Sequence, residues 1–205
     1  MMRIRADKLS KKYNRRAIFQ DISFDLGPGE SLAVTGHNGS GKSTLCKVVA
    51  GLIRPSSGSL TIEIDGVLAS KANLLNKIGM VSPYLQLYRE LNPLENATFF
   101  ANIQGRTLDM SRFKELMKRM GLAGRELDKL ATFSSGMLQR MKYVVALYSD
   151  PLLLILDEPT ANLDVQGAKV VYDIMASQQE ERILIVATNE PDEIKLGKKN
   201  VGLDP

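Results

Sequence analysis

The sequence has little of what would mark a secreted or membrane-spanning chain. It contains one cysteine, Cys46, in 205 residues, so no intrachain disulfide can form, and a buried, inert thiol is its expected role. The N-terminal segment lacks the apolar core of a signal peptide. The apolar run over residues 152–156 is far short of the ~20 residues that cross a bilayer. We therefore expect a cytoplasmic protein.

The sequence also lacks a dense block of lysine and arginine, internal repeats and low-complexity stretches. The net charge of +4 is mild, and the basic pairs at 11–12 and 15–16 are interpreted as a solvated face near a nucleotide. No nucleic-acid partner is expected. With 44% hydrophobic and 24% charged residues, the composition is that of an ordinary globular domain with a sizeable core.

What the sequence does contain is a phosphate-binding loop. Residues 36–44 read Gly-His-Asn-Gly-Ser-Gly-Lys-Ser-Thr and fit the pattern G-x-x-x-x-G-K-[ST] at every required position. A predicted strand over residues 31–35 and a helix over residues 43–50 flank it, as the motif requires. The pattern predicts a nucleoside triphosphate with Mg²⁺, in which Lys42 reaches the β- and γ-phosphates and Ser43 holds the metal. The residues expected to contact the nucleotide are Gly36, Asn38, Gly39, Ser40, Gly41, Lys42, Ser43 and Thr44.

The rest of the chain alternates strands with helices. Strands are predicted over residues 2–9, 17–26, 60–64, 77–81, 152–156 and 183–187. Helices are predicted over residues 93–104, 109–120, 135–148 and 165–178, and a short tail follows the last strand. Turns are predicted around Asn14 and over residues 27–29 and 55–58. We interpret the chain as one α/β domain, with a nucleotide-binding lobe over residues 1–82 and 151–205 and a helical insertion over about 83–150.

Two carboxylates end the most apolar predicted strand. Residues 151–158 read Pro-Leu-Leu-Leu-Ile-Leu-Asp-Glu, which is typical of a fully buried central strand. The C-terminal end of such a strand is where parallel sheets place their ligands. Asp157 would complete the magnesium site with Ser43, and Glu158 would polarise the attacking water. A helix cap is the alternative for either carboxylate, and the apolar run in a chain with a phosphate loop argues against it.

A third motif points to a family. Residues 133–140 read Phe-Ser-Ser-Gly-Met-Leu-Gln-Arg, which alone is a Ser-Gly turn that opens a helix and could bind an anion there. With all three motifs together, the chain strongly resembles the ATP-binding-cassette ATPases over nearly its whole length. Residues 133–140 look like the cassette signature, usually Leu-Ser-Gly-Gly-Gln. The sequence Ala-Asn-Leu-Asp at 161–164 looks like the loop at the cassette dimer seam.

The resemblance implies a P-loop NTPase fold with a mainly parallel central sheet, an N-terminal antiparallel β portion and a helical insertion. It implies Mg²⁺-dependent ATP hydrolysis between two cassettes packed head to tail, as a homodimer or a heterodimer. Ser134 and Gly136 of one cassette would face the γ-phosphate bound to the other, with Asp164 at the seam. Tyr13 falls where the family stacks an aromatic ring on adenine, and a tyrosine packed in a turn is the alternative.

The chain departs from the family pattern at three positions. Ser135 replaces the second signature glycine, a mild change because Gly136 and the helix N-terminus remain. Pro83 occupies the position of the family's glutamine and has no side-chain amide; Gln86 is the candidate replacement, or else a solvent-facing residue. Asn189 stands where the family has a histidine at the γ-phosphate. It can donate a hydrogen bond but cannot carry charge, so slow turnover is expected.

Two functions fit these features. The first is the ATP-hydrolysing subunit of a membrane transporter, coupled to separate transmembrane subunits and held by them at the inner face of the membrane. The stretch over residues 87–96 looks like that of exporter-type cassettes and favours export. The second is a soluble cassette ATPase that serves as an assembly factor or nucleotide-dependent binding module. For the first function, the expected docking seam comprises Tyr84, Leu85, Leu87 and Tyr88, with Phe99 and Phe100 packed nearby.

Overall fold

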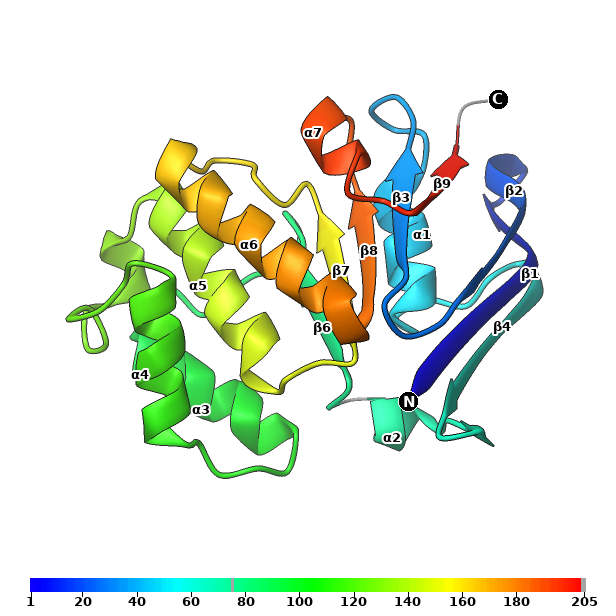
Figure 1. Cartoon of the computed structure of the whole chain (residues 1–205). Coiled ribbons are helices and arrows are strands. Elements are labelled where there is room, and N and C mark those ends of the chain that lie inside the picture. Colours follow the sequence, from blue (N-terminus) through cyan, green and yellow to red (C-terminus); the bar gives the residue numbers. More distant parts are fainter. Residues whose placement is uncertain (75, 204–205) are drawn as a thin grey trace.

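The structure, a computed structural model, describes residues 1–74 and 76–203 and contains two β-sheets. The antiparallel sheet has the order β2-β1-β4-β5, formed by β1 (Met2–Tyr13), β2 (Arg16–Leu26), β4 (Ser57–Ile64) and β5 (Val67–Leu68). The parallel sheet has the order β6-β7-β8-β3-β9, formed by β6 (Ile78–Val81), β7 (Leu153–Asp157), β8 (Ile183–Ala187), β3 (Ser31–Thr35) and β9 (Lys199–Gly202). Figure 1 shows the antiparallel sheet to the right of the parallel sheet, with helix α1 between them.

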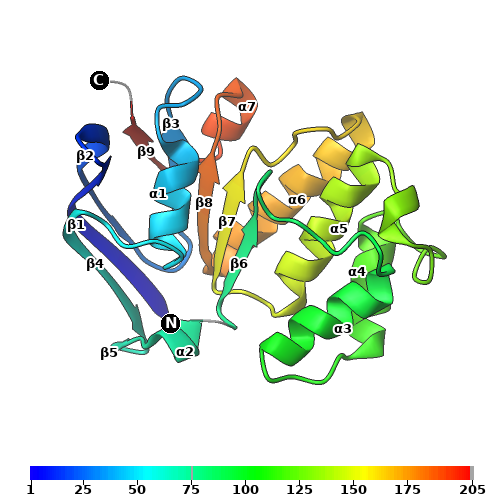
Figure 2. The ribbon, with the colours of Figure 1, turned by 180° about the vertical axis from the view of Figure 1, so that it is seen from behind.

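Helices cover both faces of the parallel sheet, as Figures 1 and 2 show from opposite sides. Helix α6 (Val165–Glu181) crosses one face, and α1 (Lys42–Val49) packs between the other face and the antiparallel sheet. Helices α3 (Pro93–Ile103), α4 (Met110–Arg119) and α5 (Ser135–Tyr148) lie together on the side of β6. Two single-turn helices, α2 (Lys71–Leu74) and α7 (Pro191–Ile194), and a 3₁₀ turn at Leu130–Thr132 complete the description.

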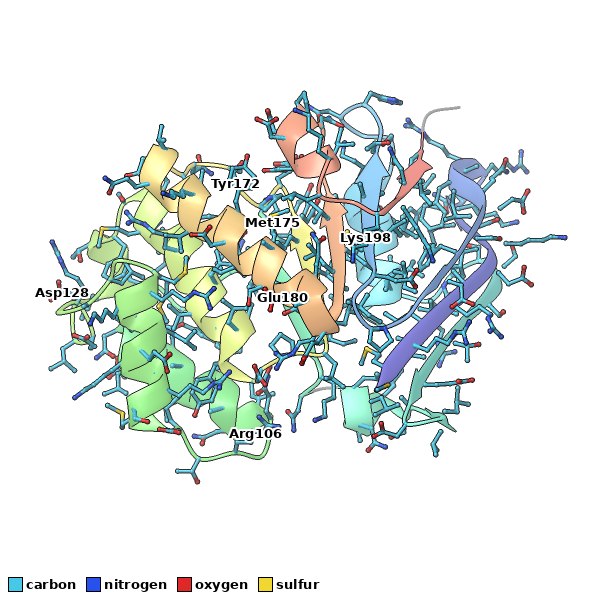
Figure 3. The ribbon with its side chains drawn as sticks, in the orientation of Figure 1. Arg106, Asp128, Tyr172, Met175, Glu180 and Lys198 are labelled. Atoms are coloured by element: carbon cyan, nitrogen blue, oxygen red, sulfur yellow. The ribbon has the colours of Figure 1, made fainter. Side chains whose placement is uncertain are left out.

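Strand β7 shows why the central strands are apolar throughout. Its side chains alternate between two faces, and both faces are covered. Leu154 and Leu156 join a core with α4, α5 and α6, whereas Leu153 and Ile155 join a core with α1 and the antiparallel sheet. Met175 of α6, labelled in Figure 3, is fully buried in the first of these cores. A polar residue inside β7 would therefore have no solvent on either side.

The structure confirms the predicted α/β fold. Every predicted strand and helix is present, with ends shifted by a few residues, and Asn14 occupies the turn between β1 and β2 with a φ of 54°. The predicted turn over residues 55–58 is too long, because β4 begins at Ser57. The expected tail is wrong, since α7 and β9 lie within it; both are too short for periodicity to reveal. Across the described residues, no helix is both long and apolar enough to cross a bilayer.

Candidate functional site

The carboxyl ends of four neighbouring parallel strands meet at one edge of the sheet. The phosphate loop follows β3, Glu158 follows β7, Ser82 follows β6 and Asn189 follows β8 by two residues. Parallel α/β sheets bind ligands just outside this edge. The fold therefore brings together segments that lie far apart in the sequence. A hydrogen bond joins Asn38 and Asn189, which are 151 residues apart.

The phosphate loop uses backbone conformations that favour glycine. Gly36, Gly39 and Gly41 have φ angles of 141°, 88° and 106°. Gly41 is also fixed by its surroundings, since a Cβ atom there would lie 2.6 Å from Ile18 Cγ2. It caps α1, so the first N–H groups of that helix, which have no intrahelical acceptor, lie at the loop. These donors and the positive end of the helix dipole favour an anion at this position.

Two polar side chains of the loop are buried. The Lys42 ammonium donates hydrogen bonds to the carbonyl oxygens of Gly36 at 2.5 Å and His37 at 3.2 Å. The Ser40 hydroxyl is buried without a hydrogen-bond partner among the described residues. Because an unpartnered buried polar group is costly, this hydroxyl fits a site that a bound anion completes. The loop thus offers a cation, a hydroxyl and backbone donors to a polyphosphate.

Strand β7 ends in two carboxylates with different surroundings. Asp157 is 1% exposed, and its Oδ2 accepts a hydrogen bond from the Ser82 hydroxyl at 3.1 Å. Glu158 has a φ of 52°, donates its N–H to the Ala187 carbonyl oxygen at 2.9 Å and exposes its side chain. A non-glycine residue with a positive φ is uncommon and persists where its surroundings hold it. The strand end therefore presents one buried carboxylate and one exposed carboxylate.

The predicted metal ligands Ser43 and Asp157 belong to elements that pack together. Cys46, on the same helix as Ser43, is fully buried; burial raises its pKa well above the usual range, and the nearby Asp157 carboxylate adds to the rise. Among residues 1–74 and 76–203, no cluster of three or more His, Cys, Asp or Glu side chains could hold a metal. A cation here would take one carboxylate, one hydroxyl, water and phosphate oxygens, a ligand set that suits Mg²⁺.

A cavity of about 330 Å³ collects the predicted catalytic residues of the sheet edge. Its lining includes Asn38 and Lys42 of the phosphate loop together with Glu158 and Asn189. The Asn189 side chain donates from Nδ2 to Oδ1 of Asn38 at 3.1 Å. The asparagine therefore contacts the phosphate loop directly, inside the cavity that holds the lysine and the exposed carboxylate. Its role toward a nucleotide stays a prediction.

The same cavity contains a residue that sequence reasoning missed. Glu193 of α7 is 1% exposed, and its Oε1 accepts a hydrogen bond from the Thr160 hydroxyl at 2.6 Å. Its Oε2 is buried without a partner in the described part of the chain. Because Thr160 follows Glu158 by two residues, this bond ties the segment after β7 to the segment after β8. A single-turn helix offers no periodicity that could have singled out Glu193.

The signature segment lies outside that cavity. Ser134 caps α5, where its hydroxyl accepts the Met137 N–H at 3.2 Å. Gly136 packs against the loop after β7, since a Cβ atom there would lie 2.9 Å from the Asn162 carbonyl oxygen. Neither Ser134 nor Gly136 lines the cavity that holds Lys42. Within one chain, the two halves of the predicted site are therefore separate.

Helix α5 nevertheless contacts both strand-end segments. The Gln139 amide and the Tyr143 hydroxyl donate to the Pro159 carbonyl oxygen, at 3.4 Å and 2.9 Å. The Lys142 ammonium donates to the Ser82 carbonyl oxygen at 2.9 Å. The helix that begins at the signature thus holds the chain directly after β6 and after β7.

Three predicted site residues lie elsewhere. Asp164 caps α6, where its carboxylate accepts the Gly167 N–H at 2.7 Å. Tyr13 ends β1 with its ring half exposed and the Lys11 ammonium 4.9 Å from the ring centroid. Gln86 lines a different cavity of about 400 Å³ at the start of α5. Gln86 therefore does not line the cavity that holds Lys42 and Glu158.

Comparisons with known proteins identify the family. The profile of the ABC transporter family matches residues 19–161. The linearmycin resistance ATP-binding protein LnrL of Bacillus subtilis is 34% identical over 188 residues, covering 91% of this chain and 60% of that protein. The ergothioneine transport ATP-binding protein EgtV of Helicobacter pylori is 34% identical over 201 residues, covering 95% of this chain and 94% of that protein. This chain thus spans 60% of the length of one relative and nearly all of the other.

A solved structure shares the fold. The ATP-binding cassette MJ0796, in a dimeric post-hydrolysis state bound to ADP and Pi, has a TM-score of 0.84 at 23% sequence identity. The match covers 98% of this chain and 94% of that chain. The sequence motifs, the geometry of the sheet edge and the similar proteins all point to the same family. The chain belongs to the ABC transporter family.

Proposed function

We propose that this chain binds and hydrolyses ATP to power transport across a membrane by closing head to tail with a second cassette. The main observation behind this proposal is that the predicted site residues fall into two separate groups within one chain. Lys42, Glu158 and Asn189 line one cavity, whereas Ser134 and Gly136 lie outside it at the start of α5. A second cassette, identical or different, would complete the site with its own α5 N-terminus, which favours an anion such as the γ-phosphate. The dimeric state of MJ0796 supports this arrangement.

Ser43 and Asp157 would hold Mg²⁺ in this site, and the phosphate loop would hold the triphosphate. When bound, Mg²⁺ neutralises charge on the β- and γ-phosphates. The buried Ser40 hydroxyl and the N–H groups of residues 41–44 would bind phosphate oxygens, and Lys42 would exchange its loop carbonyl contacts for them. Tyr13 would stack on adenine at the C-terminal end of β1, where its ring is half exposed.

Glu158 would polarise the attacking water, because its carboxylate is exposed and lines the cavity of Lys42. Asn189 would donate its amide hydrogen bond to the γ-phosphate instead of to Asn38. Without a positive charge, this amide stabilises the negative transition state less than a protonated histidine would. Slow basal turnover is therefore part of the proposal.

We further propose that residues 83–150 act as a helical subdomain and that its seam with the nucleotide-binding lobe receives a transmembrane subunit. Tyr84 and Tyr88 are 65% and 50% exposed at this seam. The Lys47 ammonium lies 4.2 Å from the Tyr84 ring centroid, and the Tyr88 ring packs edge-on against Phe99 at 4.7 Å. Exposed aromatic rings are favoured anchors of protein interfaces. The protein would then sit at the inner face of the membrane through its partner.

The substitution Glu158→Gln tests this function. Hydrolysis should fall by roughly 10²–10⁴-fold, the scale of losing a positioned base, while ATP binding persists. The variant should sediment as a dimer with ATP and Mg²⁺ and as a monomer without nucleotide. Glu180→Gln is the matched control and should behave as wild type. Glu180 lies at the C-terminal end of α6, labelled in Figure 3, whereas Glu158 precedes the N-terminal end of this helix. A Glu158→Gln variant that hydrolyses ATP at the wild-type rate would refute the role of Glu158.

A further inference from the structure

The register of the parallel sheet places Ser82 next to Asp157. Val81 of β6 pairs with Leu156 of β7, so the two residues that follow lie side by side where both strands end. Both are buried, with exposed fractions of 2% for Ser82 and 1% for Asp157. The Ser82 hydroxyl donates to Asp157 Oδ2 at 3.1 Å. Because the acceptor is a carboxylate, this hydrogen bond is charge-assisted and orients the Asp157 side chain.

Two further contacts hold Ser82 itself. Its hydroxyl oxygen accepts the Tyr84 N–H at 3.3 Å, which leaves the hydroxyl proton for Asp157. Its carbonyl oxygen accepts a hydrogen bond from the Lys142 ammonium of α5 at 2.9 Å. Burial lowers the pKa of Lys142, as expected for an ammonium partly withdrawn from solvent. Helix α5 begins next to Ser134. Ser82 therefore links this helix, through Lys142, to the Asp157 carboxylate at the end of β7.

Two other residues of this loop, Pro83 and Gln86, do not contact Asp157 in the described hydrogen bonds. Pro83 has no side-chain donor, and Gln86 lines the separate cavity at the start of α5. We propose that Ser82 is a positioning residue for Asp157 and that Lys142 holds Ser82 in place. This inference rests on the proposed function, because it takes Asp157 as a ligand of Mg²⁺.

The expected effect is on cation affinity and not on nucleotide binding as such. Removing a group that orients a metal ligand lowers metal affinity by about 10–100-fold. The lower end applies here, because phosphate oxygens and water supply most of the ligands of Mg²⁺ in nucleotide sites. The triphosphate itself is held by the phosphate loop, which Ser82 does not contact in the described hydrogen bonds.

Mn²⁺ is the probe for the test, because its binding to the protein–ATP complex is measured by electron paramagnetic resonance. Ser82→Ala should weaken Mn²⁺ binding about tenfold and leave binding of the fluorescent analogue MANT-ATP in EDTA within about twofold. Ser82→Thr keeps the hydroxyl and should retain wild-type Mn²⁺ binding. Ser31→Ala is the matched control, because it removes a buried hydroxyl bonded to main-chain groups at the opposite end of β3.

Lys142→Met is the second variant, which leaves the Ser82 side chain intact. It should weaken Mn²⁺ binding about threefold through loss of one charge-assisted hydrogen bond, again with MANT-ATP binding preserved. Wild-type Mn²⁺ affinity in Ser82→Ala, or equal losses of Mn²⁺ and MANT-ATP binding, would overturn the proposed role. Failure of the wild-type protein to bind MANT-ATP would instead refute the proposed function, so the two failures are distinguishable.

Discussion

The hydrogen bond between Thr160 and Glu193 gives a quantitative test of how the site is held together. It spans 2.6 Å inside the cavity shared with Glu158 and joins the segments after β7 and β8. The second carboxylate oxygen of Glu193 already lacks a partner among the described residues. Thr160→Val therefore leaves a buried carboxylate with neither oxygen satisfied. We expect this variant to lose about 3 kcal/mol of unfolding free energy, since stranding a buried charge costs more than stranding a neutral group.

Glu193→Leu should cost less, about 1 kcal/mol, because only the Thr160 hydroxyl is left and that residue is partly exposed to water. The double variant replaces both partners by apolar groups and should be no less stable than Glu193→Leu alone. The coupling energy of this double-mutant cycle then has a magnitude of about 3 kcal/mol or more. Urea denaturation followed by circular dichroism measures it, provided that the dependence on urea concentration stays the same in all four proteins.

Thr132→Val is the matched control, because the Thr132 hydroxyl donates to the Lys129 carbonyl oxygen at an exposed position. It should change stability by less than about 0.5 kcal/mol. A coupling energy between Thr160 and Glu193 below about 0.5 kcal/mol would refute the reasoning, because independent sites show no more than that. The bond would then be incidental, and α7 would not be tied to the segment of Glu158.

Three further predictions concern other parts of the chain. Arg182 lowers the pKa of Asp150 through a hydrogen bond, so Asp150→Asn should lower the urea midpoint at pH 7. That deficit should shrink progressively as the pH falls below about 4, and an equal deficit at pH 3 would contradict this. Asn189→His should raise the single-turnover hydrolysis rate without changing ATP affinity; an unchanged rate would make the asparagine a working replacement. Changing Tyr84 and Tyr88 to Ser should preserve ATP binding and abolish membrane-partner stimulation; intact stimulation would move the docking surface elsewhere.

The fold was predictable where one local pattern decides the structure. The continuous apolar runs of β7 and β8 specify buried strands, and Ser134 sets the start of α5 as its N-cap. Strand β9 was not predictable, because its four residues include lysine, asparagine and glycine and are held by backbone pairing with β3. Helix α7 spans one turn and carries no periodic signal.

The candidate site divides in the same way. The phosphate loop and the carboxylates Asp157 and Glu158 lie in contiguous motifs, so the sequence alone singles them out. Ser82 became visible only through the register of β6 against β7, and Glu193 only through its contact with Thr160. Both residues are polar and lie in short loops or turns. Spacing along the sequence does not reveal which strand end each of them contacts.

Mixing two defective variants tests the composite site most directly. Lys42→Ala damages the phosphate loop, and Ser134→Asp keeps a helix-capping side chain but places a carboxylate toward the γ-phosphate. Each variant alone should lack ATP hydrolysis. In a mixed head-to-tail dimer, one of the two sites combines an intact phosphate loop with an intact signature. An equimolar mixture should therefore recover about one quarter of wild-type activity if pairing is random, whereas a mixture that stays inactive would contradict a site shared between two copies of this chain.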